Sequence, residues 1–352
     1  MSAPKESTRE IAAARTSFYE SLKPQHLAPL WEVLRDLVTR EPATPALPAL
    51  WRYAEVRPFL ARAGEIISAQ EAERRVLILE NPALPGQSRI TRTLYAGLQL
   101  ILPGEMAPCH RHTQSALRFM MEGADACTAV DGEKVCMAQW DLILTPNWRW
   151  HDHVNPTNAP VVWLDGLDIP LVAALDAGFM EKLPGGGALA ESRPPGFTLA
   201  SFGANLRPAR RSSATVHRTG ELFAYPYARW REALETIRRH EHWDQYDGLK
   251  MEFTDPLNGG SLLPTISAFA QLIPTGFETV ALRSTDGSVY VVVGGRGTVE
   301  IGERTFCLEP HDVFVVPAWC SRKFHAQEDL VLFSFSDRAA QESLGLWREQ
   351  RC

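Results

Sequence analysis

The sequence predicts a mainly β protein made of two copies of one barrel or sandwich domain. Short apolar runs bounded by turn residues fill two blocks, at about residues 90–170 and 262–336. These blocks also match each other at a nearly constant spacing, which indicates an internal duplication. The length of 352 residues agrees with about two domains.

The duplication is visible in two pairs of segments. RFMMEG at 118–123 aligns with YVVVGG at 290–295, an offset of 172. DLILTPNW at 141–148 aligns with DVFVVPAW at 312–319, an offset of 171. Two matches at nearly one offset would rarely arise by chance, so we expect both blocks to share one topology.

The composition is that of a globular protein. Hydrophobic residues make up 45% and charged residues 22% of the chain, which excludes a disordered chain, a coiled coil and a small disulfide-stapled domain. With 36 basic and 42 acidic residues the net charge is −6, so neither nucleic acid nor an anionic membrane is an expected partner. Ten Trp and 25 Pro favour β-structure with rigid loops.

The cysteines and the N-terminal sequence bear on the compartment. None of the six cysteines has C-x-x-C spacing, and a chain of this length does not depend on disulfides, so we expect reduced thiols. The N-terminal segment lacks an apolar stretch of signal-peptide length, and no run of about 18 apolar residues occurs in the sequence. We therefore expect a soluble cytoplasmic protein.

The expected elements begin with helices. Residues 1–70 are predicted to form a helical arm, with an apolar stripe over 27–38 and a second helix over 56–66. Residues 71–180 are predicted to form the first barrel. Its expected strands include 98–102, 116–121, 127–130 and 142–145.

The second half is expected to follow a linker. Residues 181–261 are predicted to be this linker, because Gly, Pro, Ser and Arg are frequent over 180–215, and it carries a helix over 227–241. Residues 262–352 are predicted to form the second barrel, ending in a helix over 339–347.

The first block contains closely spaced histidines. His110 and His112 are two residues apart, so on a strand both side chains point to one face and can hold one ion. His151 completes a three-His set that suits Fe(II), Zn, Cu or Ni. His153 shares the face of His151 and is an alternative ligand. Spacing favours His151 and leaves His153 as an acid–base or hydrogen-bonding group.

This spacing resembles the two motifs of the cupin family. The first motif is Gly, five residues, His-x-His, three or four residues, Glu, six residues, Gly. The second is Pro-x-Gly, two residues, His, three residues, Asn. Besides the three histidines, the matching residues are Gly104, Gly123, Pro146 and Asn155.

Two positions depart from the motifs. Ala116 stands at the glutamate position, so the usual fourth protein ligand is missing and one side of the ion is open to substrate and dioxygen. Trp148 stands at the glycine position and is expected to narrow the surroundings of the site. In the second block the ligand positions hold Leu282, Ser284 and Arg322, which predicts a barrel without metal and one active site in the chain.

Longer stretches resemble the gentisate 1,2-dioxygenase family, which includes salicylate 1,2-dioxygenases. They cover most of residues 50–350 and include LYAGLQLILPGE at 94–105, HRHTQSALRF at 110–119 and WLDGLDIP at 163–170. The resemblance implies a bicupin fold, with two double-stranded β-helix (jelly-roll) barrels and N-terminal and linking helices. It also implies non-haem Fe(II) in the first barrel and a homotetramer.

The resemblance further implies a reaction. The family opens the C1–C2 bond of a 2-hydroxybenzoate with O2, and gentisate (2,5-dihydroxybenzoate) is the first candidate substrate. Salicylate, a 5-substituted nitro- or halosalicylate and 1-hydroxy-2-naphthoate are alternatives. Two other classes remain open: a cupin that binds a carboxylate without turnover, and a Zn-dependent hydrolase or isomerase.

Further residues are expected around the metal. Arg118 lies six residues beyond His112, so a continuous strand would point its guanidinium into the cavity, where it fits a substrate carboxylate. Asp165 is expected to orient His153 or an arginine. The other expected substrate contacts are Gln99, with Gly97 and Tyr95 on the same face of its strand, Arg74 at the entrance, and Trp148.

Two positions differ from the family pattern. The resemblance implies a tyrosine where Cys127 stands and a less basic residue where Arg149 stands. The loss of a phenol near the pocket implies altered substrate specificity.

Overall fold

The computed structural model describes residues 8–206, 209 and 220–351. The chain divides into an N-terminal unit, Met1–Ala43, and a body, Thr44–Cys352. None of the helices described is long and apolar enough to cross a membrane.

The N-terminal unit contains two α-helices, α1 (Thr8–Leu22) and α2 (Leu30–Leu37), joined through the short 3-10 helix η1 (Lys23–Gln25). The Trp31 indole donates a hydrogen bond to the Tyr19 hydroxyl (2.9 Å), which in turn donates to Glu32 (2.5 Å). Helix α2 confirms the predicted apolar stripe, and its apolar residues are exposed: Leu30, Trp31, Val33, Leu34 and Leu37.

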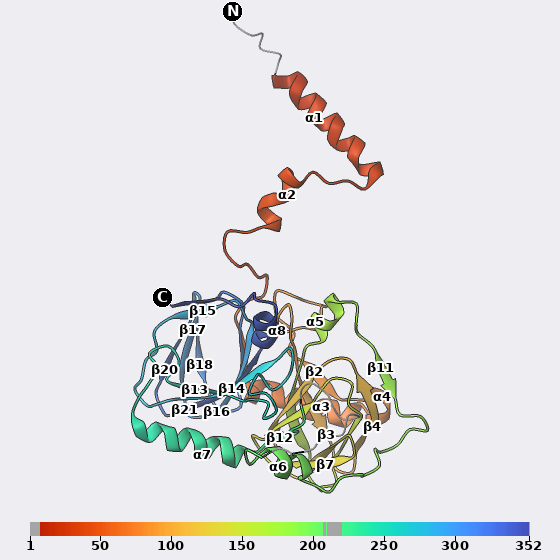
Figure 1. Ribbon diagram of the computed structural model, residues 1–352, viewed down its shortest axis with the longest axis vertical. Coiled ribbons are helices and arrows are strands. Elements are labelled where there is room, and N and C mark those ends of the chain that lie inside the picture. The colour runs from red at the N-terminus through yellow and green to blue at the C-terminus, as the bar shows by residue number, and fades with distance from the viewer. Residues whose placement is uncertain (1–7, 207–208, 210–219, 352) are drawn as a thin grey trace, which may run out of the picture. The chain divides into compact units, whose positions relative to one another are not determined.

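The body consists of two β-barrels that lie side by side (Figure 1). Each barrel combines one six-stranded and one five-stranded sheet, as the predicted fold class requires.

The first barrel holds the sheets β12-β8-β5-β10-β3-β2 and β11-β4-β9-β6-β7. In chain order its strands are β2 (Val76–Ile78), β3 (Tyr95–Ile101), β4 (Met106–His112), β5 (Ala116–Glu122), β6 (Ala126–Val130), β7 (Glu133–Met137), β8 (Leu142–Thr145), β9 (His151–Val154), β10 (Val161–Leu167), β11 (Met180–Lys182) and β12 (Ala224–Tyr225).

The second barrel holds the sheets β1-β19-β16-β21-β14-β13 and β18-β17-β20-β15-β22. Its strands are β1 (Ala49–Trp51), β13 (Leu249–Glu252), β14 (Ser267–Ile273), β15 (Leu282–Ser284), β16 (Ser288–Gly294), β17 (Gly297–Ile301), β18 (Arg304–Leu308), β19 (Val313–Val316), β20 (Arg322–Ala326), β21 (Leu330–Ser336) and β22 (Glu349–Arg351).

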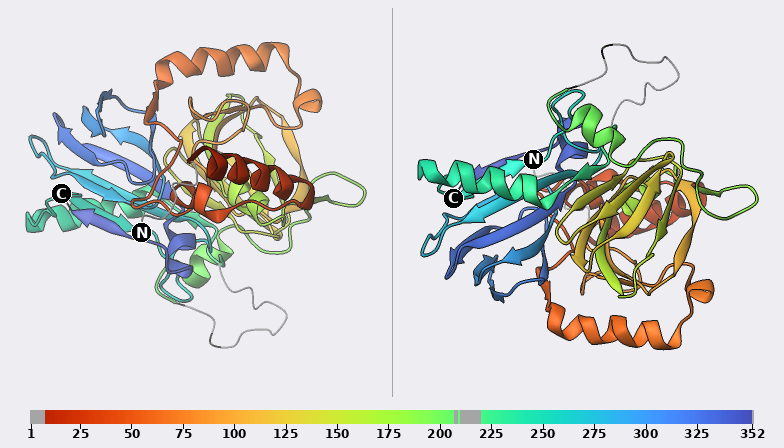
Figure 2. Two further views of the ribbon diagram at one scale, coloured as in Figure 1. Left: turned by 90° about the horizontal axis from the view of Figure 1, so that it is seen from above. Right: turned by 90° about the horizontal axis from the view of Figure 1, so that it is seen from below.

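The remaining helices of the body are α3 (Tyr53–Ile66), α4 (Ala69–Ala72), α5 (Ile169–Ala174), α6 (Phe197–Phe202), α7 (Tyr227–Ile237) with the 3-10 helix η3 (Arg238–His240), and α8 (Arg338–Ser343). Figure 2 shows α7 lying along the second barrel. The expected helix over 339–347 is shorter than predicted, because the chain leaves it after Ser343 to form β22.

The two copies share their strand register. Opposite residues on β4 and β9 include His110 and His151, and the corresponding pair on β15 and β20 is Leu282 and Arg322. In both barrels a tryptophan with positive φ, Trp148 (63°) or Trp319 (61°), donates its backbone N–H to the strand that carries the first two ligand positions (2.7 Å). The internal repeat is therefore a structural repeat.

Apolar residues between the barrels join them into one body. The Phe119 and Phe333 rings stack with their centroids 3.9 Å apart, and Gly166 lies so close to Phe335 that a Cβ on it would be 2.7 Å from that ring. Phe119 belongs to β5, so the neighbouring Arg118 points to the opposite face, into the first barrel.

Some segments join sheets beyond the expected domain limits. Strand β1 lies within the expected arm and pairs with β19 of the second barrel. Strands β12 and β13 lie within the expected linker and pair with β8 and β14. The expected domain limits at residues 70, 180 and 261 are thus crossed by strand pairing, and as domain boundaries they stay sequence-based predictions. Part of the expected linker, at 207–208 and 210–219, lies outside the described residues.

The prediction that all cysteines are reduced is wrong for Cys127 and Cys136, which form a disulfide. The hairpin of β6 and β7 places them opposite each other, and this brings their side chains together. Cys109, Cys307 and Cys320 are free.

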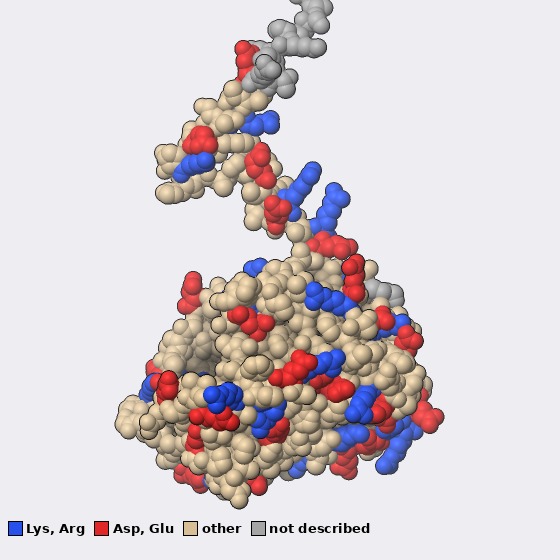
Figure 3. All heavy atoms as spheres, turned by 180° about the vertical axis from the view of Figure 1, so that it is seen from behind, with Lys and Arg blue, Asp and Glu red and all other residues tan. Residues whose placement is uncertain are grey.

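Acidic and basic side chains are intermixed over the face of the body that Figure 3 shows. Among the residues that the structure describes, that face carries no extended basic patch.

Candidate metal centre

The structure brings His110, His112 and His151 together, as predicted. One ligand atom from each ring lies within 4.8 Å of the others, and all three residues are buried. The first two point to one face of β4, and antiparallel pairing places His151 directly opposite His110. Residues that belong to two separate motifs thus meet at one point.

The hydrogen bonds of the three rings fix which nitrogen faces the centre. Each Nδ1 lies within hydrogen-bond distance of a backbone carbonyl two residues away: Pro108 for His110 (2.8 Å), Gln114 for His112 (2.8 Å) and Arg149 for His151 (2.9 Å). A carbonyl can only accept, so Nδ1 carries the proton and Nε2 keeps its lone pair.

The rings are neutral. Burial lowers the pKa of His110 to about 3 and of His112 to about 4, with the arginines nearby acting in the same direction. Burial also lowers the pKa of His151 well below its ordinary value. Neutral imidazole is the form that binds a metal ion.

These residues fit a divalent metal ion. The Nε2 atoms of His112 and His151 are buried and have no hydrogen-bond partner among the described residues. Buried polar atoms are normally satisfied, so two such lone pairs converging on one point call for a partner. An ion bound to three imidazoles would supply it and would keep further coordination positions for substrate.

A second polar cluster, built around Arg118 and His153, lies next to the three-His centre. Arg118 donates to Nε2 of His153 (2.8 Å) and to the Thr145 hydroxyl, and its Nε lies 3.3 Å from Asp165. Because the arginine can only donate, His153 presents its lone pair at Nε2 and its proton at Nδ1, 2.9 Å from the Thr128 hydroxyl. His153 is therefore a neutral neighbour of the three-His set, and its ring is held from both sides.

The structure thus places the three predicted catalytic residues, Arg118, His153 and Asp165, in one buried group. Asp165 contacts the arginine and accepts a hydrogen bond from the Trp163 indole (3.1 Å). Among the two partners predicted for it, the arginine is therefore the one it contacts. Burial lowers the pKa of Arg118 to about 10, with Asp165 acting in the opposite direction.

Sequence reasoning missed Thr128 and Thr145. Both face this cluster only because their strands, β6 and β8, lie beside β9 and β5. Nothing in the local sequence marks these threonines, and only a correct strand pairing would have identified them.

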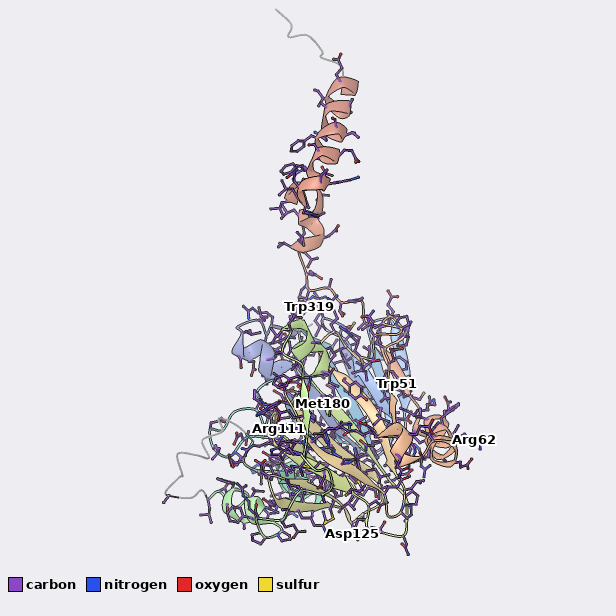
Figure 4. All side chains as sticks on the ribbon, turned by 90° about the vertical axis from the view of Figure 1, so that its right-hand side faces the viewer. Trp51, Arg62, Arg111, Asp125, Met180 and Trp319 are labelled. Carbon is purple, nitrogen blue, oxygen red and sulfur yellow. A yellow bond between two sulfur atoms is a disulfide. The ribbon has the colours of Figure 1, made fainter. Side chains whose placement is uncertain are left out.

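A cavity of about 320 Å³ opens beside His110. Arg74 lines it and contacts Nε2 of His110. Side chains from α4, the residue after it, β4 and β11 complete its wall: Ala69, Gln70, Glu73, Met106, Pro108, Met180 and Lys182. Figure 4 labels Met180 on this side of the first barrel.

Gln99 lines an adjoining recess together with Arg74. It is buried, and its amide makes no hydrogen bond to a residue that the structure describes. Gly97 is on the same face of β3, and a Cβ there would lie 2.5 Å from Val76 and 2.8 Å from the Tyr95 hydroxyl. The predicted group Gln99, Gly97 and Tyr95 is therefore brought together, and the tyrosine fills the space beside the glycine.

Trp148 lies away from the three Nε2 atoms. Its ring packs against Phe179 (4.6 Å between centroids) and under the Arg111 guanidinium (4.4 Å), and Arg111 points to the face of β4 opposite to His110 and His112. It contacts the centre through its backbone, since its N–H donates to the carbonyl of His112. The expected direct substrate contact of Trp148 therefore has no geometric support.

Arg149 and Cys127 also have structural partners. The Arg149 side chain is buried between Asp131 and Glu221 (2.9 Å to the latter). Cys127 is held in the disulfide, on the face of β6 opposite to Thr128. Neither side chain reaches the predicted pocket.

Comparison with known proteins agrees with this geometry. Residues 97–167 match the cupin domain. The chain is 49% identical to gentisate 1,2-dioxygenase 1 of Aquipseudomonas alcaligenes over 97% of both chains. It is 36% identical to 5-aminosalicylate 1,2-dioxygenase of Comamonas sp., covering 95% of this chain and 89% of the relative.

The structural similarity is equally extensive. Salicylate 1,2-dioxygenase of Pseudoaminobacter salicylatoxidans, solved as an adduct with gentisate, superimposes with a TM-score of 0.86 at 31% identity, over 99% of this chain and 95% of that one. The two barrels, the three-His centre and the full-length similarity lead to one conclusion. The chain belongs to the gentisate and salicylate 1,2-dioxygenase family of bicupin ring-cleaving dioxygenases.

Proposed function

We propose that this enzyme uses Fe(II) and O2 to open the C1–C2 bond of gentisate. The observation that carries the proposal is the set of three neutral imidazoles whose Nε2 lone pairs converge beside a cavity lined by Arg74. The 49% identity to a gentisate 1,2-dioxygenase favours gentisate over salicylate, 5-substituted salicylates and 1-hydroxy-2-naphthoate.

His110, His112 and His151 would hold the iron. When bound, Fe(II) supplies the electron-transfer chemistry with dioxygen and a template for the substrate. The protein contributes the protonated Nδ1 atoms on three carbonyls, which keep each ring oriented toward the ion.

Arg74 and Gln99 would bind the substrate carboxylate. Arg74 lines the cavity, whereas the nitrogens of Arg118 already face Thr145, His153 and Asp165. A guanidinium forms paired hydrogen bonds with a carboxylate, and the free amide of Gln99 can add another. Arg74 would thus bind the substrate carboxylate, the role that the sequence predicted for Arg118.

Arg118 and Asp165 would then position His153. The imidazole is neutral and has its lone pair at Nε2, where it now accepts from Arg118. We assign to this nitrogen the acceptance of a proton from a substrate hydroxyl once its hydrogen bond from Arg118 is broken, with Thr128 holding the opposite side of the ring. Tyr95 and Gly97 would form the part of the pocket wall that faces the aromatic ring of the substrate.

The test is oxygen consumption by the purified protein reloaded with Fe(II) under anaerobic conditions. We expect one O2 per substrate with gentisate and a ring-opened product. The panel also includes salicylate, 5-substituted salicylates and 1-hydroxy-2-naphthoate. Reloading with Zn instead of Fe(II) should give no uptake, which separates a dioxygenase from a Zn-dependent hydrolase.

Two histidine variants provide the matched comparison. His112→Ala should lose both iron and oxygen uptake, whereas His325→Ala, on an exposed position of β20, should keep both. Absence of uptake across the whole substrate panel by Fe(II)-loaded protein would refute the proposal and favour a cupin that binds carboxylates without turnover.

The proposal includes a homotetramer in the cytoplasm. Helix α2 exposes Trp31 at 65% and Leu37 at 66%, and an apolar face of this kind favours burial against another copy. Free thiols at Cys109, Cys307 and Cys320 suit a reducing compartment, whereas the Cys127–Cys136 disulfide is more typical of an oxidising one. Light scattering should give four chains per particle, and deletion of residues 1–43 should reduce that number.

A further inference from the structure

The second barrel has a cavity of its own, of about 210 Å³. Leu282, Ser284 and Arg322, which stand at the three metal-ligand positions of this copy, all line it. Tyr290 lines it as well and occupies the repeat position that Arg118 has in the first barrel. The duplication has therefore kept the cavity while replacing every ligand.

The carboxylates around this cavity already have partners. Asp286 accepts hydrogen bonds from Ser288 (3.2 Å) and Trp347 (2.9 Å). Asp247 accepts from Arg322 (2.6 Å). The two acids at the rim are also paired, since Glu252 accepts from Ser261 (2.8 Å) and Glu349 from Arg351 (3.0 Å).

Several donors, in contrast, have unused capacity. The carboxylate oxygen nearest to the Lys250 ammonium is that of Asp247, 3.6 Å away, which is too long for a hydrogen bond. The Tyr290 hydroxyl makes no hydrogen bond to any residue in the described part of the chain, although the residue is only 1% exposed. The buried Arg322 forms one short hydrogen bond, to Asp247, and one of 3.5 Å to the carbonyl of Tyr246.

The unused donors indicate the kind of ligand. Three cations, Lys250, Arg322 and Arg338, and four carboxylates, Asp247, Glu252, Asp286 and Glu349, line the cavity, and Arg338 is also paired with Glu342 (2.8 Å). The lining therefore carries no excess positive charge, and the ligand must be recognised by the unused groups, which are donors. Such groups suit a ligand that accepts several hydrogen bonds, as a carboxylate does.

The apolar walls and the volume of the cavity indicate what the rest of the ligand is like. Leu282, Phe269 and the Trp347 ring supply apolar surface, which a bare inorganic anion would not use. The volume lies below the roughly 300–1,000 Å³ of common ligand sites, so the occupant has few heavy atoms.

We propose that the second barrel binds a small organic monocarboxylate between Lys250, Tyr290 and Arg322. In the first barrel the three ligand positions hold neutral histidines, which carry no charge of their own. In the second barrel the guanidinium of Arg322, at the position of the third metal ligand, provides the positive charge permanently. This inference does not depend on the proposed dioxygenase function, because no residue of the first barrel takes part.

The test is calorimetric titration of the full-length, Fe(II)-loaded protein with benzoate and propionate under anaerobic conditions. We expect a second equivalent of carboxylate per chain that remains in the His112→Ala variant, in which the first centre is lost. Tyr290→Phe removes only a hydroxyl and should weaken this second equivalent about 10-fold or more, the effect of one hydrogen bond to a charged group. Lys250→Met should weaken it at least as much.

Lys323→Met is the matched control, because Lys323 is on the same barrel and loses the same charge while its side chain points outward beside Glu278. It should leave the second equivalent unchanged. The proposal is overturned if the His112→Ala variant binds no carboxylate, if Tyr290→Phe and Lys250→Met bind as the unaltered protein does, or if chloride or phosphate competes as well as benzoate.

Discussion

The buried ion pair of Arg118 and Asp165 offers a quantitative test of the site. Asp165→Asn keeps the shape of the side chain and the oxygen that accepts from Trp163, but it removes the negative charge opposite Arg118. The guanidinium would then be a buried charge with only neutral partners. We expect the variant to be destabilised and to hold its arginine and His153 less firmly.

The magnitude follows from burial. The side chains of Arg118 and Asp165 are 4% and 8% exposed, and Nε and Oδ1 are 3.3 Å apart. Removal of one partner from such a pair costs about 3–5 kcal/mol of unfolding free energy. Arg296 and Glu328 form a pair of nearly equal length, 3.4 Å, but both side chains are more than half exposed. Glu328→Gln should therefore cost less than about 1 kcal/mol.

Urea unfolding of both variants, followed by tryptophan fluorescence, measures the difference. Oxygen uptake by the Fe(II)-loaded Asp165→Asn protein should show a lower kcat, because Arg118 would hold the ring of His153 less firmly. If Asp165→Asn and Glu328→Gln changed the unfolding free energy equally, burial would not control the strength of this pair, and the reasoning would be refuted.

Three further changes have defined outcomes. Gly97→Ala places a methyl group 2.8 Å from the Tyr95 hydroxyl, so the ring must move and steady-state kinetics should show a KM raised several-fold; an unchanged KM would contradict the pocket wall. Burial raises the pKa of Asp247, but Lys250 and Arg322 outweigh it and bring it to about 2, below the ordinary 3.8. The pair therefore stabilises the protein above about pH 4 and loses this effect as the pH falls toward 2, so the stability deficit of Asp247→Asn in urea should shrink over that range. Cys136→Ser should lower the unfolding free energy by about 2–3 kcal/mol under oxidising conditions and by little with reductant, and an equal loss in both would argue against the disulfide.

The metal centre was predictable because its residues lie in two local motifs. His110 and His112 belong to β4, and His151 begins β9, which pairs with β4 although four other strands lie between them in the chain. Strand periodicity aims the first two rings, and the spacing of the second motif identifies the third. The acceptors of their Nδ1 protons are backbone carbonyls two residues away, so they come with the same local geometry.

The surrounding cluster was less predictable because its contacts join distant segments. Thr128 reaches His153 across 25 residues, and Thr145 reaches Arg118 across 27. Parity placed Arg118 on the correct face, but it did not predict Thr145, His153 and Asp165, which its guanidinium faces. The role of a charged residue depends on which of its hydrogen bonds are already used, and sequence spacing does not contain that information.

The sequence contained a signal for the disulfide in the position of a hairpin turn, although the number and spacing of the cysteines did not reveal it. Asp131 and Gly132 both have positive φ, as a two-residue hairpin turn requires. In such a hairpin, residues equally far from the turn are opposite each other, and Cys127 and Cys136 are each four residues from it. Counting outward from the turn predicts the pair, whereas a search for C-x-x-C motifs does not.

The two barrels show how one cavity can be used with different sources of charge. A closed β-barrel excludes water, so a ligand carboxylate inside it needs a compensating positive group. The three neutral imidazoles of the first barrel can contribute positive charge only by holding a metal ion. Arg322, at the place of His151, carries a permanent charge and is held by Asp247. If the second copy had lost its ligands without any further role, an apolar residue at position 322 would have been the less costly replacement, since burying an ion pair gains little stability over well-packed apolar side chains. The retention of Arg322, of Lys250 and of a phenol, that of Tyr290, without a hydrogen-bond partner among the described residues around one cavity is therefore better explained by a ligand than by folding alone.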